Sequence, residues 1–187
     1  MRPFDVKDLI LSPLGLRMAG KTLPCVIGKN GVSKFKQEGD GKTPTGEHQV
    51  VGMLYRPDRI PQPRKWAVPI RPRDIWSDDV NDPNYNLMET LPSSFGHERL
   101  FRPDHAYDLI IITNWNWPYA VKGRGSAIFI HSWRKKGNPT EGCIGLSRHN
   151  LQRVAKFIDF GTRVIVPQVL HDHQRWPSRH EYALRQN

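Results

Sequence analysis

The chain has very little cysteine, because its 187 residues include only Cys25 and Cys143. Two cysteines are too few for a disulfide framework or for a thiolate zinc cage, although one Cys25–Cys143 pair remains possible. Cys25 lies in the apolar, strand-like segment TLPCVIG, where a cysteine usually serves as a small buried hydrophobe. Cys143 lies between a glycine and a short apolar step, so it is the cysteine that calls for a chemical explanation.

Long apolar runs are also missing. The N-terminus lacks the apolar stretch and small-residue cleavage site of a secretory signal, and no segment reaches membrane-spanning length. We therefore expect a cytoplasmic protein without membrane insertion, or a periplasmic one if a leader has been removed. The chain has no repeat of fixed period and no low-complexity block, and its length predicts a single domain over residues 1–187.

Acidic residues are outnumbered, with 18 Asp and Glu against 28 Lys and Arg, which gives a net charge of +10. Such a surface attracts polyanions, whether nucleic acid, anionic cell-wall polymer or lipid headgroups, and charge alone does not choose among them. A basic nucleic-acid-binding module is therefore one alternative. Because the basic residues are scattered and the chain has no known base-reading motif, we do not expect nucleic acid as a partner.

Two short motifs imitate cofactor sites. The segment GDGKT, residues 39–43, resembles the end of a phosphate-binding loop, but the spacing puts Lys36 where that loop needs its first glycine. Pro44 and Gly46 also predict a turn where that loop needs a helix. The segment His171–His173, HDH, could hold a metal, yet it lies in a polar C-terminal tail. We therefore expect no cofactor and no metal.

The 16 prolines and 15 glycines favour a mostly β protein with few helices, of the α+β class, over long helices. Short apolar segments bounded by glycine, proline or asparagine predict strands. The segments are Leu9–Leu11, Gly15–Met18, Leu23–Ile27, Glu47–Leu54, Leu109–Thr113, Ala127–Ser132 and Thr162–Val166. The Pro- and Arg-rich residues 55–74 must be extended or looped, because each proline disfavours helix around itself.

One helix is predicted late in the chain, directly after the second cysteine. Four apolar residues recur at i, i+3, i+4 and i+7 and would form one buried stripe. They are Leu151, Val154, Ala155 and Ile158. Ser147 is the expected N-cap, and Gly161 is the expected end of the helix.

Cys143 is predicted to lie on a bend, because Gly142 and Gly145 permit unusual backbone geometry and Pro139 stiffens the entry. Backbone N–H groups in such a bend can converge on one point, as in an oxyanion hole. A thiol is nucleophilic as the thiolate, and its pKa falls beside a histidinium or a helix N-terminus.

His131, which follows the apolar run of SAIFIHSW, is the candidate partner of the thiol. The basic loop after it, RKK at residues 134–136, adds positive charge that favours the thiolate. From these residues alone two interpretations stay open. One is a Cys–His nucleophilic site, and the other is a hydrogen-bonded core histidine next to a loop cysteine.

The segment IFIHSW followed by PTEGCIGLS resembles the catalytic signature of the L,D-transpeptidase (YkuD-like) family. That signature is a histidine after a strand, a variable loop, then Ser or Thr, any residue, Gly, Cys and an aliphatic residue. EGDGKTPTGEHQV is similar to the early glycine and proline motif of the family, and YNL, HERLFRPDHAYDLIII and GRGSAIFIH are similar to one branch of it. The resemblance runs from about Val26 to Val166.

The resemblance implies a YkuD-like β-sandwich or barrel catalytic domain with one helix after the cysteine loop. It implies that Cys143 attacks a peptide carbonyl, that His131 activates the thiol, and that the backbone carbonyl of Ser132 orients the imidazole. The backbone N–H groups of Gly142 and Cys143 are the candidate oxyanion donors. The substrate-binding side chains that we expect are Trp133, Arg134, Thr140, Glu141, His97, Tyr107 and Trp115.

Several of these assignments have a structural alternative. His97 and Tyr107 flank a segment that the resemblance places near the mouth of the site, but they could equally make structural hydrogen bonds. Trp115 could line the cleft or cover a sheet edge. Glu141 stands where many members carry histidine, and Gly145 where they carry arginine or asparagine. A charged Glu141 would raise the thiol pKa, so we expect its side chain to point away or to bind a substrate amine.

The implied substrates are peptidoglycan stem peptides or muropeptides, cut between diaminopimelate and the terminal D-alanine through a thioester. An amine from a second stem then gives a 3-3 cross-link, as in an L,D-transpeptidase, whereas water gives an L,D-carboxypeptidase. A cytosolic member would meet recycled muropeptides at low acceptor concentration. We therefore favour a cytosolic L,D-carboxypeptidase of muropeptide recycling, keep the transpeptidase as the alternative, and note that an inactive, binding relative would share every fold feature.

Overall fold

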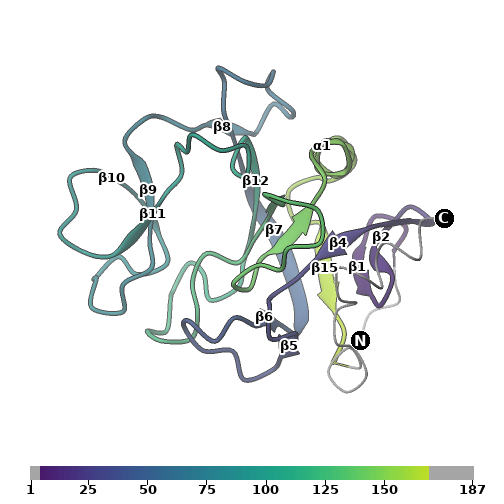
Figure 1. The fold of residues 1–187 in the computed structure, drawn as a ribbon, viewed down its shortest axis with the longest axis horizontal. Coiled ribbons are helices and arrows are strands. Elements are labelled where there is room, and N and C mark those ends of the chain that lie inside the picture. The colour runs from purple at the N-terminus through teal and green to yellow at the C-terminus, as the bar shows by residue number, and fades with distance from the viewer. Residues whose placement is uncertain (1–4, 169–187) are drawn as a thin grey trace.

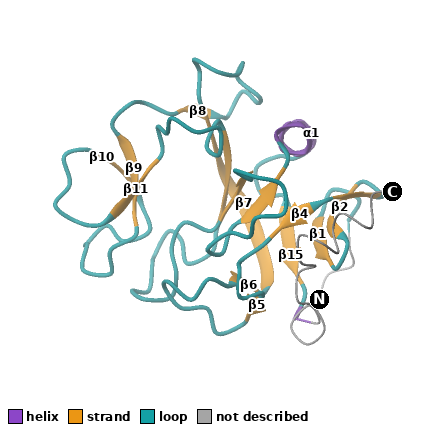
Figure 2. Ribbon diagram, viewed as in Figure 1, coloured by secondary structure: helices purple, strands orange, loops and turns teal. Residues whose placement is uncertain are grey.

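The computed structural model describes residues 5–168, which form fifteen strands and one α-helix (Figures 1 and 2). The strands of the first half are β1 Leu9–Ser12, β2 Gly15–Met18, β3 Lys21–Leu23, β4 Cys25–Val26, β5 Val32–Ser33, β6 Thr43–Pro44, β7 Gly46–Tyr55 and β8 Val68–Pro69. They are followed by β9 Asp74–Ser77, β10 Met88–Thr90, β11 His97–Arg99, β12 Leu109–Thr113, β13 Phe129–Ser132, β14 Ile144–Leu146, α1 Arg148–Phe157 and β15 Arg163–Val166.

Most strands join one sheet, which follows the order β3-β2-β1-β15-β7-β12-β13-β14-β4, with β8 added beside β7. The two ends of this path, β3 and β4, are consecutive in the chain and are separated by Pro24 alone. Proline has no N–H for the ladder, so the predicted strand Leu23–Ile27 is divided at this point. The sheet is therefore a nearly closed barrel, and the expected mostly β fold with one helix after the cysteine loop is confirmed.

Strand β12 is buried on both faces, with all five of its residues in the interior. Its side chains alternate, so Leu109 and Ile111 belong to the core inside the barrel, whereas Ile110 and Ile112 belong to a second core outside it. Because Ile110 is paired with His131 on β13, the histidine lies on the side of the second core. Cys143 packs against the same second core, so both candidate residues lie on this side of the sheet.

The second core is covered by a separate three-stranded sheet in the order β10-β9-β11, which lies to one side of the barrel in Figure 1. Trp76 of β9 packs edge-on against Phe129 of β13, with 4.9 Å between ring centroids. Glu98 of β11 is the cross-strand neighbour of Trp76, and neighbours on a sheet share a face. The small sheet thus turns Trp76 and Glu98 toward β13.

Helix α1 follows β14 and has Ser147 as its N-cap, as predicted, with Ser147 Oγ accepting the N–H of Asn150 at 3.2 Å. Its end differs from the prediction. The helix stops at Phe157, because Ile158 already has extended backbone, and Gly161 lies in the following turn with φ of +82°. There the N–H of Gly161 donates to Val50 O at 2.8 Å and leads the chain into β15.

The predicted strand Ala127–Ser132 is shorter than expected and begins at Phe129, because Ala127 has a φ of +50° that a strand does not accommodate. The Pro- and Arg-rich residues 55–74 are mostly loop, as expected.

No helix within residues 5–168 has the length and apolar character needed to cross a membrane. The expected single domain over residues 1–187 stays a prediction.

Candidate active site

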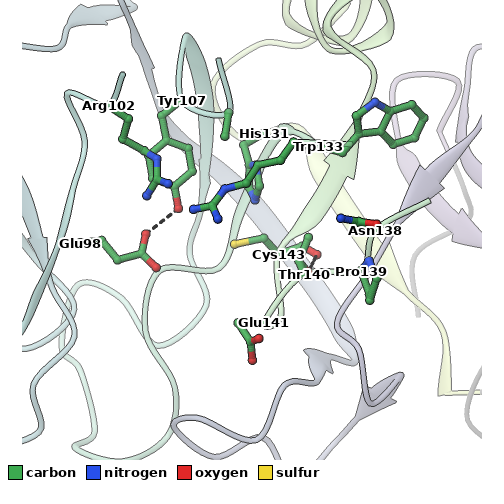
Figure 3. A pocket seen from close by; sticks show the side chains of 12 residues that line it. Glu98, Arg102, Tyr107, His131, Trp133, Asn138, Pro139, Thr140, Glu141 and Cys143 are labelled. Atoms are coloured by element: carbon green, nitrogen blue, oxygen red, sulfur yellow. Dashed lines mark hydrogen bonds between the residues drawn. The ribbon is translucent and has the colours of Figure 1, made fainter. Parts of the chain in front are cut away.

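A cavity of about 280 Å³ lies where the loop before β14 meets β13 and the small sheet (Figure 3). It holds both residues of the predicted Cys–His pair. The lining residues are Glu98, Arg102, Ala106, Tyr107, His131, Trp133, Arg134, Asn138, Pro139, Thr140, Glu141 and Cys143. The sequence-distant segments 98–107 and 131–143 therefore form one site.

Cys143 is positioned by the parallel pairing of β13 and β14, in which Ile130 is paired with Ile144. This register brings the cysteine beside Phe129, whose N–H donates to Cys143 Sγ at 3.4 Å. The thiol in turn donates to the carbonyl oxygen of Ala127 at 3.0 Å. The sulfur is thus fixed by backbone groups and points into the cavity in Figure 3.

His131 is buried on β13, with its Nδ1 2.8 Å from the carbonyl oxygen of Ser132. A carbonyl only accepts, so Nδ1 carries the ring proton and Nε2 keeps its lone pair. This is the contact that the family resemblance implies for Ser132. Tyr107 packs edge-on against the imidazole, with 5.2 Å between ring centroids. The ring is therefore held in one orientation and one tautomer.

Burial sets the protonation of both groups. It lowers the pKa of His131 to about 4, which the nearby charges of Arg102 and Arg134 assist and the hydrogen bond to Ser132 O opposes. It raises the pKa of the Cys143 thiol to about 12. The resting pair is therefore a neutral thiol and a neutral imidazole, and the expectation of a thiolate is wrong for this state, because desolvation outweighs the basic loop.

The loop that carries the thiol is tied down by two threonines. Thr140 Oγ1 donates to Cys143 O at 2.6 Å and accepts the N–H of Gly142 at 3.2 Å. Thr43, from the GDGKT segment, donates its hydroxyl to Gly142 O at 2.7 Å. Gly142 has a φ of +151°, and a Cβ there would lie 2.8 Å from Lys42 O, so only glycine fits.

The hydrogen bond to Thr140 corrects one expectation about Gly142. Its N–H already has an acceptor, so in this state it is not a free oxyanion donor. The sequence prediction treated the bend as a set of converging N–H groups. It did not foresee that a hydroxyl two residues earlier would use one of them.

Five of the predicted substrate-binding residues line the cavity, namely Tyr107, Trp133, Arg134, Thr140 and Glu141. Glu141 is largely exposed and forms an ion pair with Lys29 Nζ at 2.7 Å. Its carboxylate is therefore turned toward Lys29, which agrees with the expectation that it points away from the thiol.

His97 and Trp115 are not among the residues that line the cavity. The backbone alternation of β11 puts His97 on the opposite face from Glu98, and its Nδ1 lies 2.8 Å from Phe95 O. Trp115 is buried, packs edge-on against His48 and donates its Nε1–H to Arg124 O at 3.2 Å. Both residues therefore follow the structural alternative.

Glu98 and Arg102 are the charged cavity residues that the sequence analysis missed. Glu98 Oε2 accepts the hydroxyl of Tyr107 at 2.5 Å, as Figure 3 shows. Arg102 lies over the Tyr107 ring, 5.0 Å from its centroid, and pairs with Asp104 at 2.7 Å. The signal in the sequence was the segment HERLF. Neighbouring residues of a strand point to opposite faces, so Glu98 and His97 had to be on different sides of it.

Cys25 and Cys143 are both free thiols, so the disulfide that the sequence left open does not form. Cys25 is fully buried, as expected of a small hydrophobe. Within residues 5–168 no cluster of three or more His, Cys, Asp or Glu side chains could hold a metal. The segment His171–His173 lies outside the described residues.

The family model described as the YkuD L,D-transpeptidase catalytic domain matches residues 17–166, which is most of the chain. The chain therefore belongs to the YkuD-like L,D-transpeptidase catalytic domain family. No curated protein is similar enough to the chain to be matched to it.

Several solved structures are similar to the chain at low identity. An L,D-transpeptidase from Mycobacterium smegmatis is 16% identical, with a TM-score of 0.39, 85% of this chain covered and 56% of that one. L,D-transpeptidase 1 from Mycobacterium tuberculosis is 15% identical, with a TM-score of 0.38 and coverage of 85% and 61%. L,D-transpeptidase 3 from the same organism is 18% identical, with a TM-score of 0.37 and coverage of 80% and 46%. The chain spans roughly half of the length of these proteins.

Proposed function

We propose that this domain is a cysteine acyl transferase that cleaves the bond between diaminopimelate and terminal D-alanine in peptidoglycan stem tetrapeptides. One observation carries the proposal. Cys143 and His131 line one cavity, and the Ser132 carbonyl holds the imidazole in the tautomer that leaves Nε2 ready to accept a proton. The substrate class follows from membership of the L,D-transpeptidase family.

The first half-reaction forms a thioester. As Cys143 Sγ attacks the peptide carbonyl carbon, its proton passes to His131 Nε2, so general-base catalysis replaces a preformed thiolate. The tetrahedral intermediate collapses with cleavage of the C–N bond, and the imidazolium gives its proton to the departing amine of D-alanine. The tripeptide acyl group then remains on the sulfur.

The second half-reaction determines which of two activities the enzyme has. Attack by a stem-peptide amine gives a cross-link and makes the protein an L,D-transpeptidase, whereas attack by water makes it an L,D-carboxypeptidase. We propose transfer to an amine, which the family description supports. Hydrolysis in cytosolic muropeptide recycling stays a prediction, as does the compartment.

Mass spectrometry of the intact protein tests the proposal. On incubation with the diaminopimelate-containing tetrapeptide, we expect wild-type protein to gain the mass of the tripeptide acyl group and to release D-alanine. Cys143→Ala should show neither change, with D-alanine release at least about a thousandfold slower.

Cys25→Ala is the matched control, because that thiol is buried away from the cavity, and it should behave as wild type. Release of D-alanine by Cys143→Ala at the wild-type rate would refute the assignment of the nucleophile. Binding of the tetrapeptide without release by wild type would instead identify an inactive, binding relative.

A further inference from the structure

Glu98 is the charged cavity residue that thioester formation does not use. It extends from β11 on the face of the small sheet that packs against β13, and it lines the cavity together with Cys143 and His131 (Figure 3). It is connected to the imidazole by Tyr107, whose hydroxyl donates to Glu98 Oε2 and whose ring packs on His131. The carboxylate is therefore part of the reaction chamber.

The second carboxylate oxygen of Glu98 is left for a ligand. Among residues 5–168 no hydrogen bond is made to Oε1, and no ion pair is made by the Glu98 carboxylate. The two guanidiniums that line the cavity both pair with Asp104 instead, Arg102 at 2.7 Å and Arg134 at 3.3 Å. The cavity thus keeps one carboxylate whose charge is not matched by a direct partner.

This placement is unfavourable for the first half-reaction. The charge of Glu98 raises the pKa of the Cys143 thiol, so it opposes thiolate formation. Its own environment is also acidic, because Asp78 and Glu38 lie near enough to disfavour its ionised form. A buried carboxylate in such surroundings is stabilised by a cation, and the cation of this reaction is the ammonium group of the acyl acceptor.

We propose that Glu98 binds the ammonium group of the acyl acceptor and takes a proton from it, so that the acceptor attacks the Cys143 thioester as a free amine. The proposal rests on the acyl-transfer function and names its acceptor as a primary amine that is charged in solution. Glu98 would then be the residue that favours transfer to an amine over hydrolysis.

Each proton that moves in this step has a donor and an acceptor. One proton moves from the ammonium group to Glu98, and the neutral nitrogen forms a bond to the thioester carbonyl carbon. His131 Nε2 takes a second proton from the attacking nitrogen and returns it to the sulfur as the C–S bond breaks. The products are an amide and the Cys143 thiol, and Glu98 releases its proton to solvent.

The environment of Glu98 suits a proton acceptor. Burial raises the pKa of its carboxyl group, and Asp78 and Glu38 raise it further, whereas the Tyr107 hydrogen bond and Arg102 oppose the rise. A carboxylate with an ordinary pKa is a weak base at neutral pH, and a raised pKa improves its ability to remove a proton. The geometry and the electrostatics of the cavity agree on this role.

The test is the ratio of amide product to hydrolysed tripeptide, which does not depend on how fast the thioester forms. Wild-type protein and Glu98→Gln are given the tetrapeptide with methylamine, which is charged at neutral pH, or with hydroxylamine, which is not. Gln keeps the oxygen that accepts the Tyr107 hydroxyl. The matched control is Glu89→Gln, on β10 of the same small sheet and outside the cavity.

We expect Glu98→Gln to lower the methylamine ratio by at least about tenfold and to keep the hydroxylamine ratio within about twofold of wild type. Glu89→Gln should match wild type with both nucleophiles. Equal ratios in wild type and Glu98→Gln, or an equal fall with both nucleophiles, overturn the role of Glu98 and leave the acyl-transfer function standing. If wild type forms no thioester at all, both proposals fail.

Discussion

Desolvation decides the chemistry of the two catalytic candidates. The same burial raises the pKa of the Cys143 thiol and lowers that of His131, so neither group carries charge before a substrate arrives. The thiol donates its hydrogen to Ala127 O, and the imidazole keeps a lone pair at Nε2. A neutral resting pair also slows the alkylation of Cys143 by small electrophiles, because the thiol is a much weaker nucleophile than the thiolate.

The neutral pair predicts how alkylation of Cys143 depends on pH. The thiolate fraction of a thiol with a pKa of about 12 grows roughly tenfold per pH unit. The rate of modification by iodoacetamide should therefore rise steadily between pH 7 and pH 9 on the order of tenfold per unit. Peptide mass spectrometry measures it.

Cys25 is the internal control for this measurement. Burial also raises its thiol pKa to about 12, but the side chain is fully buried, so it should react far more slowly than Cys143 at every pH. A Cys143 rate that levels off below pH 8 would show a thiolate–imidazolium pair and contradict the neutral state.

Elements with a local signal were predicted well. Helix α1 has an N-cap and an apolar stripe within twelve residues, and β12 begins with four consecutive apolar residues, so neither needed long-range information. Boundaries failed where a single backbone angle decides them, as at Ala127. The end of α1 was predicted too late, because Ile158, the last residue of the apolar stripe, already has extended backbone.

The small sheet was missed because its signal is not local. Strands β10 and β11 have three residues each, largely polar, and they exist through pairing with β9. The side that Glu98 faces depends on that pairing and on Trp76 packing against Phe129. For the same reason the sequence pointed to His97 and not to its neighbour, and it could not give the burial that sets the pKa values.

The Ser147 cap offers a prediction at the scale of one element. Ser147→Ala should lower the free energy of unfolding by about 1 kcal/mol, because the N–H of Asn150 loses its acceptor. The first turn contains no acidic residue that could replace the cap. Urea denaturation followed by circular dichroism measures the change.

Ser147→Asp is the matched variant, since aspartate also accepts that N–H and favours the positive end of the helix. It should retain the wild-type free energy of unfolding or exceed it. An alanine variant as stable as wild type would mean that solvent satisfies the first turn equally well.

The fold brings acidic side chains together in one region of a basic protein, which the composition does not reveal. The protein as a whole is strongly basic, yet three carboxyl groups interact across the region that contains the cavity, namely Glu38, Asp78 and Glu98. Beside these carboxyl groups a cationic amine would be attracted. The net charge therefore does not give the local balance, because two glutamates and two arginines line the cavity.

Basic groups also hold the molecule together through ion pairs that respond to acid. Asp8, just before β1, bonds Arg163 of β15 at 2.5 Å and fixes the first strand to the last. Burial opposes ionisation of Asp8, but the hydrogen bonds from Arg163 and from the backbone N–H of Asp5 outweigh it and lower the carboxyl pKa. Asp40, bonded to Lys36 at 2.6 Å, is shifted in the same direction.

These shifts predict that acid destabilises the fold. A carboxyl group with a lowered pKa in the native state adds stability that is fully present above its unfolded pKa of about 3.9 and is lost as the pH falls through the native value. The urea midpoint should therefore fall between pH 5 and pH 2.5. Asp8→Asn should have a lower midpoint than wild type at pH 7 and a smaller acid-induced fall, because its amide cannot titrate. If the variant and wild type lose the same amount of stability over this range, the Asp8–Arg163 pair does not account for the acid sensitivity, and the growing repulsion among the basic residues would explain it instead.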